Sequence, residues 1–313
     1  MAELVALLDF GSNAVRCVLA QVKRTGFRVL HEERSQTRLG GGEPGTLPTA
    51  AVDASLRAVR GFMREVRLDF EDSDDEYEWP PKIIAVATAA VREAKNRSRL
   101  LAPLRREHGI EIRVLSASEE ARLGAEAALE DLRKFDGVIA DLGGGSLQLT
   151  AVRRGHMAGT RSAPLGAVRM TRRFLRTDPP EPRELRALRL EIRARLAAVL
   201  PPAQRGDEMV GLGGTIRSLA RVHLAERRKR RRHRQGLRLS QAEVTELTQR
   251  METASLRERR EVRGLNPERA DTILAGSILV EEMLIFGGYQ ALIVSTRGVR
   301  DGLLLRETRR GAR

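Results

Sequence analysis

The sequence contains a single cysteine, Cys17, among 313 residues. One thiol cannot form an internal disulfide, and it leaves no thiol cluster for zinc or redox chemistry. Because Cys17 lies in an apolar stretch, we expect it to be packed rather than reactive. The five histidines show no metal-ligand spacing, and no Ser/His/Asp order or nucleophile elbow is present. The histidines are therefore expected to be surface or packing residues, and covalent catalysis has no support.

Aromatic residues and long apolar segments are also scarce. Aromatics make up 3% of the chain, with one Trp and two Tyr, so the stacking platforms that single-stranded nucleic acid requires are poorly supplied. No uninterrupted apolar segment reaches the roughly 18 residues needed to span a bilayer, and no basic region precedes an apolar stretch at the N-terminus. We expect a cytoplasmic protein with no membrane partner, and nucleic acid is an unfavoured substrate.

What the chain has in excess is positive charge. Lys and Arg number 56 against 42 Asp and Glu, which gives a net charge of +14. Such a balance favours polyanionic partners and speeds their capture. The basic run over residues 227–234 is compatible with a polyanion landing surface, a nucleic-acid arm or a solvated connection.

One pattern occurs twice. An apolar run ends in an aspartate and breaks into small residues, first after Asp9 and again after Asp141. Each copy predicts a buried strand, a tight turn and a second strand, over residues 15–22 and 147–152 respectively. A single copy has an ordinary hairpin as its alternative, but the two copies together suggest two related domains. The turn residues are Gly11, Ser12 and Asn13 in the first copy, and Gly143, Gly144, Gly145 and Ser146 in the second.

These turns are predicted to bind phosphate. Glycine has no Cβ and tolerates positive φ, so successive backbone N–H groups can converge on a bulky anion. A carboxylate beside phosphate requires an intervening cation, which predicts Mg²⁺ or Mn²⁺ near Asp141 and also at Asp9. A third glycine-rich segment, Gly213, Gly214 and Thr215, opens a predicted helix whose first N–H groups are anion donors, with close packing as the alternative reading.

Strand and helix patterns alternate along the chain, as in α/β domains. Beyond the two hairpins, strands are expected over residues 27–33, 83–88, 111–116 and 291–295, with a further strand entering residue 210. Helices are expected over residues 48–66, 184–200 and 267–286. The predicted class is α/β.

Seven motifs in this order resemble the Ppx/GppA family, which contains exopolyphosphatases and guanosine pentaphosphate phosphohydrolases. They are DFGSN from Asp9, ATAAVREA from Ala87, VLSASEEARL from Val114, DLGGGS from Asp141, PLGAVR from Pro164, GLGGT from Gly211 and STRGVRDG from Ser295. The resemblance implies the superfamily of actin, the heat-shock chaperones and sugar kinases. Two ribonuclease-H-like domains then face each other across a cleft, formed by residues 1–124 with 299–313 and by residues 125–298. It also implies the short two-domain form and a homodimer.

The resemblance further implies a metal-dependent hydrolase that releases terminal orthophosphate from inorganic polyphosphate. In the family's Glu-Glu-Ala-Arg motif the second glutamate acts as the base, and Glu120 occupies that place. Glu119 and Glu120 differ by about 100° around a helix, so one of them faces the site. Without the resemblance, acids in a first helical turn would be explained by the helix dipole. Arg92 matches a position that can neutralise charge on the transferred group.

One position departs from the family pattern. After the glycines the family continues Ser-Thr-Glu, whereas this chain has Ser146, Leu147 and Gln148. Glutamine keeps an acceptor oxygen but loses the negative charge, so metal affinity or water activation should fall at this predicted metal position. Two alternatives to the exopolyphosphatase stay open: hydrolysis of the guanosine pentaphosphate pppGpp, and a weakly active or silent sensor of polyphosphate or nucleotide.

Overall fold

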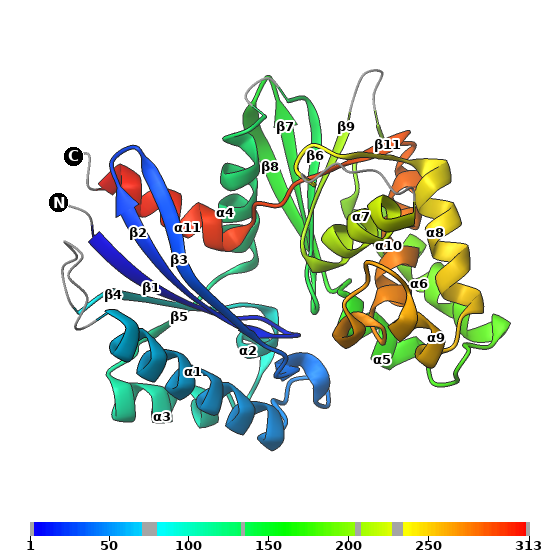
Figure 1. Ribbon diagram of the computed structural model, residues 1–313. Helices are drawn as coiled ribbons and strands as arrows, with labels where there is room; N and C mark the ends of the chain where they lie inside the picture. The colour runs from blue at the N-terminus through cyan, green and yellow to red at the C-terminus, as the bar shows by residue number, and fades with distance from the viewer. Residues whose placement is uncertain (1–2, 71–79, 133–134, 204–207, 227–233, 311–313) are drawn as a thin grey trace. The chain divides into compact units, whose positions relative to one another are not determined.

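Two β-sheets organise the chain, and each belongs to its own α/β unit (Figure 1). The computed structural model describes residues 3–70, 80–132, 135–203, 208–226 and 234–310. The first unit comprises Met1–Ala117 and Arg300–Arg313, and the second comprises Ser118–Val299. Sequence analysis placed the boundary after residue 124, which lies within helix α4 (Ala117–Leu129). All but one residue of the basic run over 227–234 lie outside the described part of the chain.

The first unit has a five-stranded sheet in the order β3-β2-β1-β4-β5. Strands β1, β2 and β3 form an antiparallel meander, whereas β4 and β5 run parallel to β1 and are reached through helices, as parallel pairing requires. The elements are β1 (Glu3–Phe10), β2 (Val15–Lys23), β3 (Gly26–Ser35), the 3₁₀ turn η1 (Leu39–Gly41), α1 (Thr49–Phe70), β4 (Lys82–Ala87), α2 (Ala89–Glu93), α3 (Ser98–His108), β5 (Ile112–Val114) and α11 (Val299–Arg310).

The two faces of this sheet are covered by different helices. Leu4, Ala6, Leu8 and Phe10 of β1 pack in a core with residues of α1 and α3. Because successive residues of a strand point to opposite faces, Asp9 projects from the other face. Helix α11 joins the unit through ion pairs with the strands, Arg300 with Glu32 on β3 (2.6 Å) and Glu307 with Lys82 on β4.

The second unit has a six-stranded sheet in the order β10-β11-β9-β6-β7-β8. Its centre is the parallel pair β6 and β9, and β6 also begins the antiparallel meander β6-β7-β8. The elements after α4 are β6 (Gly137–Leu142), β7 (Leu147–Arg153), β8 (His156–Ala163), α5 (Ala167–Phe174), α6 (Pro182–Val199), β9 (Glu208–Leu212), α7 (Gly214–Glu226), β10 (Arg238–Ser240), α8 (Gln241–Thr253), α9 (Leu256–Glu261), the 3₁₀ turn η2 (Pro267–Arg269), α10 (Ile273–Gly287) and β11 (Ala291–Val294).

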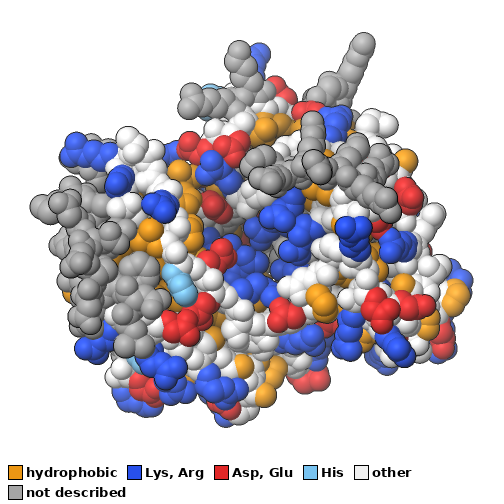
Figure 2. All heavy atoms as spheres, viewed as in Figure 1, with side chains coloured by type: hydrophobic (Ala, Val, Ile, Leu, Met, Phe, Trp, Pro, Cys, Tyr) orange, Lys and Arg blue, Asp and Glu red, His pale blue; other side chains and the backbone are white. Residues whose placement is uncertain are grey.

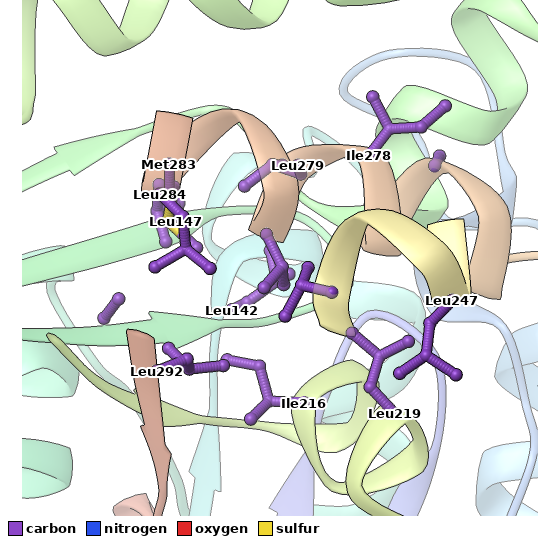
Figure 3. Close-up of a cluster of buried hydrophobic side chains, with 14 of the residues drawn as sticks. Leu142, Leu147, Ile216, Leu219, Leu247, Ile278, Leu279, Met283, Leu284 and Leu292 are labelled. Carbon is purple, nitrogen blue, oxygen red and sulfur yellow. The ribbon is translucent and has the colours of Figure 1, made fainter. Parts of the chain in front are cut away.

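A large apolar core fills one face of this sheet. Figure 3 shows Leu142 and Leu147 of the β6–β7 hairpin among side chains of α7, α8 and α10, including Leu219, Leu247 and Ile278. Burial of this many aliphatic side chains is the main stabilising term for the unit. The opposite face carries a smaller cluster in which Ala125 and Ala128 of α4 pack with Ile139 of β6. Asp141 lies two residues beyond Ile139, so its side chain projects on the α4 side.

Several elements differ from the sequence-based expectation, and two of the differences have a clear physical reason. Strand β8 was not predicted, because an edge strand with mostly exposed polar residues carries little apolar alternation. The helix expected over residues 267–286 begins instead as η2, where the side chain of Asn266 accepts from the N–H of Glu268, and α10 starts only at Ile273. Helix α10 is buried on nearly all sides, so its sequence lacks the amphipathic period that marks a helix start. In the described ranges, none of the helices combines the length and apolarity that crossing a membrane requires.

Candidate active site in the glycine turns

The two glycine turns close with the same hydrogen bond. Gly11 donates its N–H to the carbonyl of Ala14 (3.1 Å), and Gly143 donates to the carbonyl of Ser146 (3.0 Å). The strand register is also the same in the two hairpins. Asp9 pairs with Arg16 and Asp141 pairs with Gln148, and in each case the partner lies two residues after the residue whose carbonyl closes the turn. The repeat seen in the sequence is therefore a repeat of backbone structure.

In the second unit, the carbonyl groups of the turn are occupied from one side. The carbonyls of Gly143 and Gly144 accept from the N–H groups of Ala167 and Arg169, each at 3.1 Å. The carbonyl of Gly145 accepts from Nε of Arg169 at 2.7 Å. This approach requires glycine at position 166, because a Cβ there would lie 2.2 Å from the carbonyl oxygen of Gly144. The start of α5 thus fixes the turn by its carbonyls.

The N–H groups of the same turns point elsewhere. Among the described residues, the N–H groups of Gly144 and Gly145 have no acceptor. The first unit repeats the arrangement. The carbonyl of Ser12 accepts from the N–H of Gly40 (2.7 Å), and the carbonyl of Asn13 accepts from the N–H of Arg38 (3.1 Å). The N–H groups of Ser12 and Asn13 have no acceptor within the part of the chain described. Successive unpaired N–H groups form an anion-binding concavity. Both turns therefore present backbone donors of the kind predicted to hold phosphate, and the phosphate-binding role itself stays a prediction.

Asp141 lies between α4 and the β9–α7 turn. A Cβ at Gly124 of α4 would lie 3.1 Å from Oδ2 of Asp141, and one at Gly213, whose φ is +100°, would lie 3.3 Å from Oδ1. The carboxylate is therefore closely packed between these two glycines. Glu120 lies one turn before Gly124 on the same face of α4, and its side chain is buried whereas Glu119 is only half-buried. Of the two adjacent glutamates, Glu120 is the one on the Asp141 side.

Gln148 is the cross-strand partner of Asp141, so the two side chains are neighbours on one face of the sheet. Its Nε2 donates to Oγ of Ser146 at 2.6 Å. Its Oε1 is buried and has no hydrogen-bond partner among the described residues. A buried acceptor without a partner is costly unless a ligand or water satisfies it. A carboxylate and an amide oxygen side by side are the donor types that Mg²⁺ or Mn²⁺ takes, so these residues fit a divalent cation.

The equivalent pair in the first unit has a different charge. There Asp9 is the cross-strand partner of Arg16, which also lies 3.8 Å from Glu32. A cationic residue as the cross-strand neighbour of Asp9 weakens the case for a cation there. The two predicted metal positions, Asp9 and Asp141, are thus unequal in a way that the sequence motif conceals.

Sequence analysis missed Arg269. A Cβ at Gly214, the first residue of α7, would lie 2.2 Å from Nη2 of Arg269, so the guanidinium lies directly against the start of this helix. No motif marks this arginine, because it reaches the helix from η2, more than fifty positions along the chain. The side chain of Thr215, by contrast, packs against Gly276 of α10. The predicted phosphate-binding segment 213–215 therefore offers backbone N–H groups and a neighbouring cation.

Arg92 belongs to the first unit. Its Nη1 donates to the carbonyl of Leu115 at 2.9 Å, which ties α2 to the residue that follows β5. Glu120 and Asp141 belong to the second unit, and the role of Arg92 stays a prediction.

Lys and Arg side chains are prominent on the face shown in Figure 2, with Asp and Glu interspersed.

Two mixed α/β units, each with a strand-aspartate-glycine turn at its centre, define a protein of the actin-like superfamily. Within that superfamily, the model of the Ppx/GppA phosphatase family matches residues 18–310, and the chain belongs to this family. The fold class and family expected from the sequence are confirmed.

Relatives extend over nearly the whole chain. Exopolyphosphatase 2 of Mycobacterium tuberculosis is 28% identical over 332 residues, covering 96% of this chain and 97% of its own. The solved structure of the Aquifex aeolicus member of the family superposes with a TM-score of 0.79 at 27% identity and covers 100% of both chains. An exopolyphosphatase structure from Cytophaga hutchinsonii gives a TM-score of 0.85 at 21% identity over 98% of each chain, a similarity of fold. These matches support a hydrolase of phosphoanhydrides.

Proposed function

We propose that this protein is a metal-dependent exopolyphosphatase that releases terminal orthophosphate from inorganic polyphosphate. The observation that carries the proposal is the turn at residues 143–146, whose carbonyls are engaged by α5 while the N–H groups of Gly144 and Gly145 have no acceptor among the described residues. Such a turn holds phosphoryl oxygens through backbone donors. The net charge of +14 favours a polyanion, and the relatives named exopolyphosphatase support this substrate class.

Glu120 acts as the general base in this proposal. It lies one helical turn before Gly124, on the face of α4 that Gly124 presents to Asp141. It takes a proton from the water that attacks the terminal phosphorus. The guanidinium of Arg269, at the start of α7, stabilises negative charge on the transferred group.

Asp141 and Oε1 of Gln148 would hold a divalent cation, Mg²⁺ or Mn²⁺. When bound, the cation neutralises charge on phosphoryl oxygens.

The test compares phosphate release from long-chain polyphosphate, short-chain polyphosphate and pppGpp, each with Mg²⁺ and with Mn²⁺. We expect release from polyphosphate by the wild type, and a loss of at least about 10²-fold in kcat for Glu120→Gln, as for removal of a general base. Glu119→Gln is the matched control, since it removes an adjacent charge from the same helical turn and should leave kcat unchanged. Full turnover by folded Glu120→Gln would refute the assignment, and release from pppGpp alone would change the substrate.

The presence of Gln148 favours a second candidate function, that of a polyphosphate or nucleotide sensor with little turnover. The uncharged amide at this position binds a cation less tightly than a carboxylate does, and its Oε1 lacks a protein partner within the described residues. Restoring the acid with Gln148→Glu should raise turnover or metal affinity. Tight polyphosphate binding without phosphate release, in wild type and variant alike, would select the sensor.

A further inference from the structure

A second group of metal-ligating side chains lies in the first unit. Nε2 of His31 and carboxylate oxygens of Glu33 and Glu65 all lie within 4.8 Å of one another. His31 and Glu33 are two residues apart on β3 and so share a face of the strand, while Glu65 reaches them from α1. No metal-ligand spacing marked His31 in the sequence, because these ligands come from two elements more than thirty residues apart.

The spacing of the three atoms fits a tetrahedral ion. Two ligands each about 2.0–2.2 Å from zinc in a tetrahedral site lie roughly 3.3–3.6 Å from each other. Nε2 of His31 lies 3.2 Å from Oε1 of Glu33 and 3.9 Å from Oε2 of Glu65. These two separations differ from the tetrahedral range by a few tenths of an ångström, and the third pair of ligand atoms lies within 4.8 Å. One imidazole and two carboxylates leave a fourth position for water, which suits zinc.

The surroundings hold the ligands in place and favour an added cation. The ring of His31 packs against that of Phe62, with centroids 5.8 Å apart, which restricts the imidazole. Glu33 and Glu65 place two carboxylates beside one imidazole, and carboxylates brought together in this way gain stability when a cation joins them. The thiol of Cys17, across from Glu33 on β2, is buried and is not one of the three clustered ligands.

The cluster is separate from the glycine turn of the same unit. His31 and Glu33 pair with Leu19 and Cys17, whose side chains belong to the core beneath α1 and α3. Asp9 and Arg16 project from the opposite face of the sheet. An ion bound at the cluster therefore would not contact the phosphate-binding turn.

We propose that His31, Glu33 and Glu65 bind a zinc-type divalent transition-metal ion, which ties the edge strand β3 to helix α1. Strand β3 ends the sheet order of the first unit, so on one side it has no neighbouring strand. A metal link to α1 stabilises this edge. The site is structural and does not depend on the hydrolytic activity proposed above.

The test uses the full-length, metal-stripped protein in excess Mg²⁺, which occupies sites made of oxygen ligands alone. Zn²⁺ affinity is measured by competition with a chromophoric chelator, and Co²⁺ is added as a probe whose visible absorption reports a tetrahedral site with nitrogen and oxygen ligands. We expect one Zn²⁺ per chain, a higher melting temperature with Zn²⁺, and a tetrahedral Co²⁺ spectrum. His31→Asn and Glu65→Gln should each weaken Zn²⁺ binding by at least about tenfold and remove the melting shift.

His156→Asn is the matched control, because His156 is an exposed histidine at the start of β8 in the other unit. It should bind Zn²⁺ as the wild type does. The variants His31→Asn and Glu65→Gln lie on different elements, so a folding defect in one of them does not spoil the test. Circular dichroism verifies that both are folded. Absence of Zn²⁺ binding by the wild type, or equal affinity in wild type, His31→Asn and Glu65→Gln, would overturn the proposal. Phosphate release by His31→Asn in Mg²⁺ should equal that of wild type, so this result is independent of the proposed function.

Discussion

Replacement of Gly214 by alanine should separate activity from stability. A Cβ at this position would lie 2.2 Å from Nη2 and 2.3 Å from Nη1 of Arg269. Ordinary van der Waals contact begins at 3.4 Å, so the guanidinium must retreat by at least 3.4 − 2.2 = 1.2 Å. The end of a flexible side chain can make this move without shifting the backbone. The substitution therefore displaces the cation from the start of α7 while leaving the fold in place.

The expected losses follow from the geometry. A charge-assisted hydrogen bond requires a distance of about 2.7–2.9 Å, which a shift of 1.2 Å abolishes. Loss of such a bond to a phosphoryl oxygen costs about 1.5–3 kcal/mol, or roughly 10- to 150-fold in kcat/KM. Alanine is also a better helix former than glycine by up to about 1 kcal/mol, so the free energy of unfolding should hold or rise.

The assay is the initial rate of phosphate release across polyphosphate concentrations, with urea unfolding followed by circular dichroism. Gly61→Ala in α1 is the control, because a Cβ there meets nothing within 4 Å. It should gain about 0.5–1 kcal/mol of stability and keep its full kcat/KM. Arg269→Gln should reproduce the kinetic loss of Gly214→Ala. If folded Gly214→Ala and Arg269→Gln both retain wild-type kcat/KM, the role assigned to this arginine is wrong.

Two further predictions concern stability. Arg189 forms ion pairs at 2.7 Å with Glu252, Glu281 and Glu282, of which the last two side chains are 4% and 0% exposed. Arg189→Met leaves buried carboxylates short of a counter-charge and should cost about 3–5 kcal/mol in urea unfolding. A cost below about 1 kcal/mol, which is what an exposed ion pair contributes, would contradict this reasoning. Glu184, in the capping box of α6, is partly desolvated, which raises its pKa, but hydrogen bonds from Thr177, Arg176 and Glu181 outweigh this and lower the pKa. A lowered pKa stabilises the fold above the unfolded value of 4.5, so Glu184→Gln should lose roughly 0.5–1 kcal/mol at neutral pH, and the difference from wild type should vanish as pH falls through the folded pKa.

Local patterns were enough to predict much of the architecture. The strand-aspartate-glycine repeat, the α/β alternation and the family all follow from the order of residues, because apolar periodicity and turn chemistry are properties of short segments. Glu120 and Gln148 were also identified from the sequence, by motif and by departure from motif. Strand β8 was missed because an exposed edge strand carries no such signal.

Contacts between distant segments could be decided only by the tertiary structure. Arg269 reaches Gly214, Gly124 makes room for Asp141, and His31 meets Glu65, each across a separation that no local pattern spans. The two turns look equivalent in sequence but differ in the residue that lies beside the aspartate. Strand pairing places Arg16 beside Asp9 but Gln148 beside Asp141, and cross-strand neighbours are set by register, which only the folded sheet defines. The sequence by itself predicted two turns of one type, and the fold decided that their aspartates have different cross-strand neighbours.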